Sequence, residues 1–365
     1  MSELQSHIHK VSKAIEEWLQ PDNSDLKKAI DRTVEEDFFS FQDIKHQILV
    51  LKSTLRKKNL NVWADRAGLK YNSLNQKKVL CLHAGNLPLV GIQDLLSVVL
   101  TRGDYVGKVS KKDPYLLPTL LRKLIDFDLI KENRWSLNLE ELVGNRMDAV
   151  LFAGSKSSAY EVRSSLKSLK IIDDHTPALM RNAHFSIALI EYNDSPTMED
   201  LTEAVFRYGG TGCRSVAIVV APFHLDDEKC EYTDYVESFW LKNPQHKKPE
   251  KSLFYRYAYN RALEIPQAWL NDFLIEENIS NPKEKFLLFW VKGDFNTLTE
   301  LVSMYRDGLQ SVYSTSNHIG KEVGGFRVEP LSQAQAPPIW WKPDQIDTIE
   351  WLQKKVAHQE KNSQL

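Results

Sequence analysis

Apolar residues in this chain alternate between strand-like and helix-like spacing from about residue 77 onward. Short continuous apolar runs indicate buried strands, whereas apolar residues that recur every three or four positions indicate helices. Strands are expected at 77–82, 104–110, 148–152, 185–192, 215–221 and 286–291. Helices are expected at 91–100, 114–127, 158–169 and 197–206, and after residue 296. This alternation predicts an α/β fold, with a mostly parallel sheet and helices on both of its faces.

Residues 1–70 have a different pattern, which is helical and charged. Ser40 and Asp43 fit a capping box at the start of a helix. The apolar residues that follow at helical spacing are Phe41, Ile44, Ile48, Leu51 and Leu55. We expect this helix to pack against the body of the protein. Residues 224–252 are expected to form surface helix and loop, and residues 346–356 a last amphipathic helix.

Composition narrows the class of protein. A chain of 365 residues, 42% of them hydrophobic, can bury a large core and is long enough for about two domains. A net charge of -2 argues against nucleic acid as the main partner. Three cysteines do not make a disulfide framework and favour a reducing compartment. Without a run of about 18 apolar residues or a signal-peptide pattern, we expect no membrane span and a cytoplasmic protein.

Cys213 is the candidate nucleophile. Gly209, Gly210 and Gly212 precede it, and a strand-like run begins soon after it. Glycines let the backbone fold tightly around a reactive sulfur and bring N–H groups close to a substrate oxygen, as a site that forms a thioester requires. The alternative is a buried cysteine at the start of a strand.

The other two cysteines have different surroundings in the sequence. Cys81 lies inside an apolar run, so we expect it in the core. Cys230 lies in a charged stretch, so we expect it at the surface without a role in the chemistry.

Asn86 follows the first strand of the alternating region, in the sequence His-Ala-Gly-Asn-Leu-Pro at 83–88. The tip of a strand before a helix is where open α/β sheets place ligands. Gly85 permits a close approach, and the amide of Asn86 is able to donate a hydrogen bond to a developing oxyanion. The alternative is an ordinary strand-to-helix turn, in which asparagine is a frequent cap.

Lys108 and Ser110 lie at the end of the next strand and are candidates for holding the ribose or a phosphate of a nucleotide. Lys111 and Lys112 come directly after them and favour the additional 2′-phosphate of NADPH. The alternative is a polar turn with solvated lysines.

Gly154 and Ser155 end the third strand, just before a helix. Small residues there allow a nucleotide to pack against the helix start, whose free N–H groups and dipole favour anions. A G-x-G-x-x-G fingerprint is missing from the sequence.

His184 precedes the strand that leads toward Cys213 and is the candidate general base for its thiol. The alternative is a partly buried histidine at a strand end.

Taken in order, these segments resemble the aldehyde dehydrogenase superfamily, and most closely its acyl-CoA reductase branch, which includes the fatty acyl reductase of luminous bacteria. The resemblance covers roughly residues 77–355. The segments that carry it are 83–88, 108–110, 152–155, 212–215, 333–338 and 347–348.

The resemblance implies a Rossmann-like cofactor domain, an α/β catalytic domain and reduction of an acyl thioester to an aldehyde. The substrate is expected to be an acyl-CoA or an acyl-carrier protein, with NADPH as the cofactor and no metal. Catalytic roles fall on Cys213, Asn86 and His184, the last of which resembles the histidine proposed as base in the fatty acyl reductase. The residues expected to hold NADPH are Lys108, Ser110, Gly154 and Ser155.

The sequence departs from the superfamily pattern in two places. Val109 stands where the nucleotide-binding Lys-Pro-Ser motif has proline. The glutamate that helps water to hydrolyse the thioester in oxidising dehydrogenases has no clear equivalent, and this fits a reductase.

The expected domains are an N-terminal helical extension at 1–70, a nucleotide-binding domain at 71–190, a catalytic domain at 191–330 and a tail at 331–365 that packs back on the body. The chain is shorter than most aldehyde dehydrogenases, so the usual oligomerisation arm is in doubt and a homo-oligomer stays open. The alternative functions are an oxidising aldehyde dehydrogenase, a thioester-dependent acyltransferase, and an inactive scaffold that has kept the fold.

Overall fold

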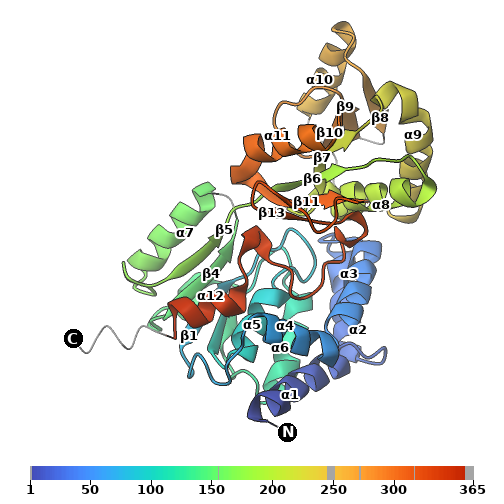
Figure 1. The fold of residues 1–365 in the computed structure, drawn as a ribbon. Coiled ribbons are helices and arrows are strands. Elements are labelled where there is room, and N and C mark those ends of the chain that lie inside the picture. Colours follow the sequence, from blue (N-terminus) through green and yellow to red (C-terminus); the bar gives the residue numbers. More distant parts are fainter. Residues whose placement is uncertain (1, 155, 245–250, 271–272, 316, 358–365) are drawn as a thin grey trace. The chain divides into compact units, whose positions relative to one another are not determined.

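A computed structural model describes residues 2–154, 156–244, 251–270, 273–315 and 317–357. The chain forms two compact units (Figure 1). The first contains the residues up to 182 and those from 338 onward, and the second contains residues 183–337. Each unit is built on its own sheet with helices packed against it, which confirms the predicted α/β class.

The first unit has a five-stranded parallel sheet in the order β3-β2-β1-β4-β5. Its strands are β1 Lys78–Leu82, β2 Asp104–Lys108, β3 Trp135–Ser136, β4 Ala149–Ala153 and β5 Ala178–Arg181. The segments between them include α5 Ile92–Leu100, α6 Leu116–Asp126, η1 Leu139–Leu142 and α7 Lys156–Ser168. The strand order reverses between β1 and β4, which is the point where such sheets bind ligands at their carboxyl ends.

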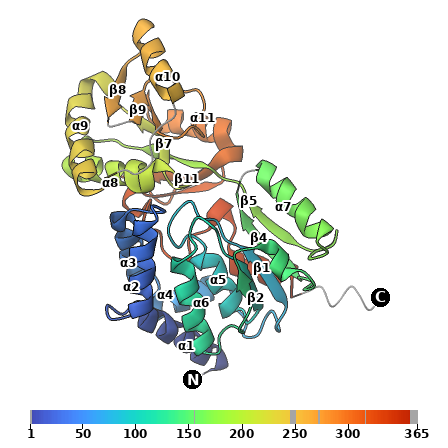
Figure 2. The same cartoon turned by 180° about the vertical axis from the view of Figure 1, so that it is seen from behind.

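Alternate residues of β1 belong to separate cores on the two faces of this sheet. Val79 and Cys81 pack in the larger core with α5 and α6, whereas Leu80 packs in the smaller core with Leu166 of α7. Figures 1 and 2 show α7 on one side of the sheet and α5 and α6 on the other. Both faces are therefore covered, as the alternation of strands and helices predicts.

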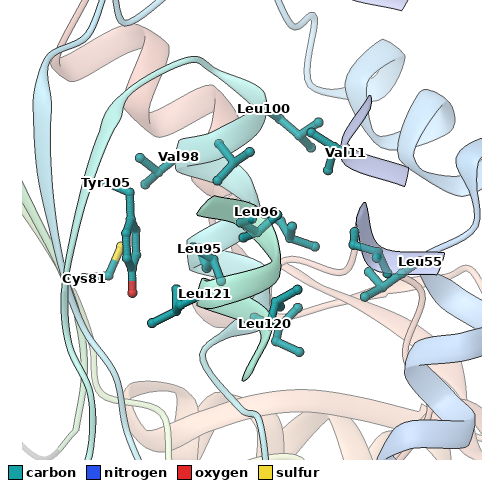
Figure 3. Packing of buried hydrophobic residues seen from close by; sticks show 14 of the residues in the cluster. Val11, Leu55, Cys81, Leu95, Leu96, Val98, Leu100, Tyr105, Leu120 and Leu121 are labelled. Atoms are coloured by element: carbon teal, nitrogen blue, oxygen red, sulfur yellow. The ribbon is translucent and has the colours of Figure 1, made fainter. Parts of the chain in front are cut away.

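The N-terminal helices belong to the larger core rather than to a separate body. They are α1 Glu3–Trp18, α2 Ser24–Glu35, α3 Phe41–Thr54 and α4 Lys57–Arg66. Figure 3 shows Val11 and Leu55 of this region beside the leucines of α5 and α6. Trp18 donates its indole N–H to Thr119 at 2.7 Å. Ser40 caps α3 as predicted, although Phe41, expected to pack, is 52% exposed at the first position of the helix.

The C-terminal segment also packs in the first unit. It contains η5 Pro343–Gln345 and α12 Thr348–Lys355. Trp63 of α4 donates to the Asp347 carboxylate at 3.0 Å, and Asp347 also caps α12. A buried hydrogen bond therefore joins α4 of the N-terminal helices to the start of α12 in the C-terminal segment.

The second unit has an eight-stranded sheet in the order β12-β13-β11-β6-β7-β10-β9-β8, parallel except for β12 and β8 at its edges. Its strands are β6 Phe185–Leu189, β7 Val216–Ala221, β8 Gln267–Leu270, β9 Phe273–Glu276, β10 Leu287–Lys292, β11 Leu309–Ser314, β12 Glu322–Val323 and β13 Phe326–Pro330. Its helical segments are α8 Ser195–Phe206, η2 Arg207–Gly210, α9 Leu225–Lys242, α10 Lys251–Ala262, α11 Phe295–Tyr305, η3 Arg306–Gly308 and η4 Leu331–Gln333.

Strand β6 pairs with β7 and β11 and therefore belongs to the second unit. The domain expected at 71–190 would have included it, whereas the compact units divide after residue 182. An apolar run predicts a strand, but it does not tell which sheet the strand joins.

Candidate active site

Cys213 lies in the second unit, in the loop between η2 and β7. Three residues of η2 directly before this loop, Tyr208, Gly209 and Gly210, have φ angles of 58°, 66° and 66°. This left-handed conformation favours glycine, and a Cβ at Gly210 would lie 3.0 Å from the carbonyl oxygen of Val205. The glycines therefore permit the sharp turn between α8 and the strand.

The two cysteines whose side chains the structure describes differ in exposure. Cys81 is 1% exposed inside β1, and burial raises the pKa of its thiol well above the usual range. A thiol held neutral in this way is a poor nucleophile, so Cys81 is a core residue as predicted. Cys213 is half-buried, as an attacking sulfur requires. The side chain of Cys230 lies outside the described residues.

Hydrogen bonds tie the Cys213 loop to the start of β6. Ser186 donates its hydroxyl to the carbonyl of Cys213 at 3.2 Å and its backbone N–H to the carbonyl of Ser215 at 3.0 Å. The backbone N–H of Ser215 donates back to Gly212 at 3.0 Å, which closes a turn around the cysteine. These contacts fix the backbone on both sides of Cys213.

His184 stands directly before β6, and its backbone N–H donates to the carbonyl of Gly308 at 2.9 Å. Strands β6 and β7 are parallel neighbours with Ser186 opposite Val216. Because adjacent strands lie about 4.8 Å apart, the residues that precede them emerge side by side at the same end of the sheet. The structure therefore brings His184 and Cys213 to the amino ends of neighbouring strands.

Gln335 supports the same loop from a distant part of the chain. It is 2% exposed, and its amide donates to the carbonyl of Ala204 at 2.9 Å and approaches the Ser215 hydroxyl at 3.5 Å. The sequence analysis noted segment 333–338 only for its resemblance to the reductase branch. A glutamine between alanines gives no sequence signal of a buried bridge, so this role was missed.

Asn86 lies in the first unit, in the turn after β1. The asparagine is exposed, whereas Leu87 and Pro88 beside it are buried. The amide of Asn86 is therefore accessible to solvent, while the residues after it anchor the turn in the protein interior. This placement is compatible with hydrogen bonding to a bound substrate.

Two buried contacts hold the base of this turn. The His83 imidazole lies 2.7 Å from the Tyr105 hydroxyl, and burial lowers the pKa of His83 to about 4, so its ring is neutral. A Cβ at Gly91 would lie 1.9 Å from His83 Nδ1, and a Cβ at Gly85 would lie 2.2 Å from the Ser110 hydroxyl oxygen. Glycine at 85 therefore lets the turns after β1 and β2 touch.

Lys108 ends β2 in a half-buried position. Burial lowers the pKa of its ammonium group, and Lys111 nearby lowers it further. The backbone N–H of Val109 donates to the carbonyl of Ser136 in β3 at 2.8 Å, which a proline at this position cannot do. The departure from the Lys-Pro-Ser pattern thus adds a hydrogen bond between β2 and the segment of β3.

Gly154 follows β4, and its backbone N–H donates to the carbonyl of Arg181 at 2.9 Å. A Cβ at this position would lie 2.5 Å from the Phe152 ring. Ser155 lies outside the described residues. Asn86 and Gly154 thus follow β1 and β4, and Lys108 ends β2. The three residues lie at the carboxyl end of neighbouring strands in one sheet.

Asp113 is a buried carboxylate that the sequence analysis missed. It is 3% exposed, and one of its oxygens accepts the backbone N–H of Leu89, a residue at φ 58°, at 2.9 Å. Burial raises the pKa of Asp113 to about 6, against the opposing effect of the N–H groups of Leu89 and Leu116. The side chain therefore joins the turn after β1 to that after β2 while ionised at neutral pH.

Asp113→Asn is expected to stabilise the protein more at neutral than at acidic pH. A carboxyl whose folded pKa is raised binds its proton more tightly in the native state, so its contribution to stability falls as pH rises from about 4 to about 6. The amide carries no such penalty. The free energy of unfolding of the variant minus that of wild type should be about 1–2 kcal/mol larger at about pH 7.5 than at about pH 5. Parallel stability curves, measured by urea unfolding, would contradict this origin of the shift.

A crevice of about 640 Å³ opens in the first unit near the amino end of β2, whereas these turns follow the carboxyl ends of the strands. It is lined by α1, the end of α5, the first residues of β2 and the loop after α6. Two ion pairs lie in its lining, Lys131 with Asp104 at 3.0 Å and Lys10 with Asp128 at 3.9 Å. The crevice is therefore separate from the turns of this unit that carry Asn86, Lys108 and Gly154.

Among the described residues, no helix is long and apolar enough to cross a membrane. In the same part of the chain, no group of three or more His, Cys, Asp or Glu residues is placed to hold a metal ion.

Solved structures similar to this chain include aldehyde dehydrogenases. Aldehyde dehydrogenase 21 from Physcomitrella patens, in complex with succinate, is 12% identical with a TM-score of 0.61, and the match covers 97% of this chain and 84% of that one. The NADP-dependent glyceraldehyde-3-phosphate dehydrogenase from Bacillus halodurans C-125, complexed with NADP, is 13% identical with a TM-score of 0.52, covering 90% and 83%. The chain therefore has the aldehyde dehydrogenase fold, as its motifs predict.

The family follows from the sequence of the first unit and the start of the second. Residues 22–217, more than half of the chain, match the family described as acyl-CoA reductase (LuxC), and the protein belongs to this family. The activity printed for this family is the reduction of acyl-CoA. A long-chain acyl-protein thioester reductase 2 from Photobacterium leiognathi is 30% identical over 69 residues, which are 19% of this chain and 14% of that relative.

Proposed function

We propose that this protein reduces an acyl thioester, delivered by CoA or by an acyl-carrier protein, to an aldehyde with NADPH and through a thioester on Cys213. The observation that carries the proposal is the position of Cys213, which is half-buried in a hydrogen-bonded turn just before β7. Strand β7 pairs with β6, and His184 directly precedes β6. Membership of the acyl-CoA reductase (LuxC) family supports this chemistry. The printed activity of the Photobacterium relative, a thioester reductase, supports the substrate class.

The carboxyl edge of the first sheet fits an anionic dinucleotide. Burial lowers the pKa of Lys108, and the charge of the nearby Lys111 lowers it further. A phosphate near both lysines would relieve their repulsion. Gly154 comes just before the start of α7, where free N–H groups favour anions. In this proposal Lys108, Ser110, Gly154 and Ser155 hold the coenzyme, and bound NADPH supplies a hydride.

The protein's own residues carry the remaining steps. His184 takes the proton of the Cys213 thiol, and the sulfur bonds to the acyl carbon while the carrier thiol leaves with a proton. The amide of Asn86 and the backbone N–H of Cys213 donate to the oxyanion of the tetrahedral intermediate. After hydride addition to the acyl carbon, the bond between carbon and Cys213 sulfur breaks, and the aldehyde leaves.

Replacement of His184 by alanine is expected to slow acylation of Cys213 by about 10²-fold at neutral pH. The loss should shrink at high pH, because a free thiol then ionises without a base. Rapid-quench measurement of acyl transfer from acyl-CoA, without coenzyme, follows this step alone. An acylation rate equal to that of wild type across the pH range would remove His184 from the mechanism.

Preference for NADPH is expected to depend on Lys111. Because a charge-assisted hydrogen bond contributes about 1.5–3 kcal/mol, Lys111→Glu should raise the dissociation constant for NADPH by about 10- to 100-fold. The dissociation constant for NADH should change little, since NADH lacks the 2′-phosphate. Fluorescence titration of both coenzymes measures this directly. An equal loss for both would place Lys111 away from the 2′-phosphate.

The function itself is tested by mixing the protein with acyl-CoA and NADPH and measuring both coenzyme oxidation and the aldehyde by gas chromatography. We expect equal amounts of aldehyde and oxidised coenzyme. Aldehyde supplied with NADP⁺ in the absence of CoA is the matched reaction for an oxidising dehydrogenase. Faster turnover in that reaction, with free acid as product, would replace the proposed function with the oxidising one.

A further inference from the structure

Leu89 has an unusual backbone conformation in the turn after β1. Its φ angle is 58°, in the left-handed region, and its side chain is 1% exposed. A large residue keeps this conformation only where the surrounding structure holds it, and such strained positions cluster at active sites. Leu89 lies three residues after Asn86, the proposed oxyanion donor. The contacts that fix the backbone of Leu89 therefore also fix the turn that carries the donor.

The contact that holds Leu89 comes from the turn after β2. The backbone N–H of Leu89 donates to a carboxylate oxygen of Asp113 at 2.9 Å, and Asp113 is 3% exposed. A hydrogen bond to an ionised acceptor is stronger than one to a neutral group, and a buried N–H that loses its acceptor is costly. The carboxylate therefore favours the conformation of Leu89 in which this N–H faces Asp113.

Residues 110–113 form a compact turn that fixes the position of this carboxylate. The backbone N–H of Asp113 donates to the carbonyl of Ser110 at 3.2 Å, and the backbone N–H of Lys112 donates to the Ser110 hydroxyl, also at 3.2 Å. The Ser110 side chain and the Asp113 carboxylate thus belong to one hydrogen-bonded turn. Ser110 is also one of the residues proposed to hold the coenzyme.

Turn 110–113 contacts the turn after β1 on both sides of Asn86. Before Asn86, a Cβ at Gly85 would lie 2.2 Å from the Ser110 hydroxyl oxygen, so glycine lets the two turns come this close. After Asn86, the hydrogen bond from Leu89 reaches the same turn. Asn86 itself is exposed between these two contacts. Its backbone is therefore anchored on either side while its amide stays accessible.

We propose that Asp113 is a positioning residue for Asn86. Its carboxylate holds Leu89, and through Leu89 the turn, in the conformation that keeps the Asn86 amide in place to donate to the oxyanion. The inference rests on the proposed function, because this oxyanion forms only if Cys213 attacks an acyl thioester. Asp113 does not touch the reacting atoms. It spares the turn from reordering when the oxyanion forms, which is how preorganised donors lower a barrier.

Asp113→Ala removes the acceptor and should slow single-turnover acylation of Cys213 by about 10- to 10²-fold, because a displacement of about 1 Å at a catalytic group costs that much. The half-saturating concentration of acyl-CoA should stay within about threefold of wild type, since the donor acts on the tetrahedral intermediate and not on the bound substrate. Rapid-quench mixing without coenzyme measures both. Asp113→Val also lacks the acceptor, fills more of the buried volume and should show the same loss, so it replaces the alanine variant if that variant does not fold.

Two further variants separate positioning from lost stability. In Asp113→Asn the amide oxygen still accepts the N–H of Leu89, so acylation should stay within about threefold of wild type. Asp104 lies at the other end of β2, is 7% exposed and pairs with Lys131 at 3.0 Å and Arg134 at 2.9 Å. Asp104→Ala should lower the thermal unfolding midpoint and leave the acylation rate within about twofold of wild type, because it breaks a buried ion pair away from the Asn86 turn.

The double variant Asn86→Ala/Asp113→Ala tests whether Asp113 acts through Asn86. If it does, the double variant should be as slow as Asn86→Ala alone, whereas independent effects multiply. A multiplied loss, an acylation rate of Asp113→Ala equal to that of wild type, or an equal loss in Asp113→Ala and Asp104→Ala would each overturn the proposal. A wild type that acyl-CoA does not acylate would instead refute the proposed function.

Discussion

Cys213→Ser abolishes reduction of acyl thioesters, with a loss in kcat of at least about 10⁴-fold, because a serine hydroxyl is a far weaker nucleophile than a thiolate at neutral pH. The side chain is half-buried and the loop is held by backbone hydrogen bonds, so the smaller oxygen should leave the fold intact. NADPH binding, measured by fluorescence, should be unchanged. Steady-state assay of coenzyme oxidation with acyl-CoA gives the rate.

Cys81→Ala is the matched control for this prediction. Cys81 is also a free cysteine, but it is 1% exposed and its thiol is held neutral by burial. The substitution should leave kcat within about twofold of wild type while lowering stability by about 1 kcal/mol, since a buried sulfur is removed. Activity retained in Cys213→Ser and lost in Cys81→Ala would reverse the assignment of the nucleophile.

Asn86→Ala should lower kcat by about 10²- to 10³-fold, the cost of removing one hydrogen-bond donor from a developing oxyanion. The proposed role requires the loss to appear in kcat rather than in KM, because the donor acts on the tetrahedral intermediate and not on the bound substrate. Single-turnover acylation with acyl-CoA separates this step from hydride transfer.

The turn around Asn86 should survive the substitution. Asn86 is exposed, and the turn is held from below by His83 with Tyr105 and by Asp113 with Leu89. The thermal unfolding midpoint and the NADPH dissociation constant of Asn86→Ala should therefore match wild type. A variant with normal kcat, or one that also loses NADPH binding, would contradict an oxyanion role.

The alternating core of the fold was predictable from the sequence. Strands β1, β2, β4, β6, β7 and β10 fall within two residues or so of their predicted starts, because each is an apolar run followed by a helix with a clear apolar period. The strands that were missed are β3, β5, β8, β9, β11, β12 and β13. Gln310 and Ser311 interrupt the apolar pattern of β11 although both are buried. Strands β8 and β9 are only four residues long, and each includes a polar residue, Gln267 and Glu276.

The sequence suggests candidate residues where the proposed chemistry depends on a residue type and its local spacing. The glycines before Cys213 and the asparagine after β1 are such cases. Asp113 and Gln335 were missed because their roles depend on partners far away in the chain, 24 residues for Asp113 with Leu89 and 131 for Gln335 with Ala204. A single sequence gives no measure of which distant loops will touch.

The most direct test of the account is the intact mass of the protein after mixing with acyl-CoA in the absence of coenzyme. We predict a mass increase equal to one acyl group, located on the peptide that contains Cys213, removed by hydroxylamine at neutral pH and missing from Cys213→Ser. Addition of NADPH should discharge the acyl group as aldehyde. An unmodified Cys213 under conditions in which the protein turns over acyl-CoA and NADPH would contradict the thioester mechanism.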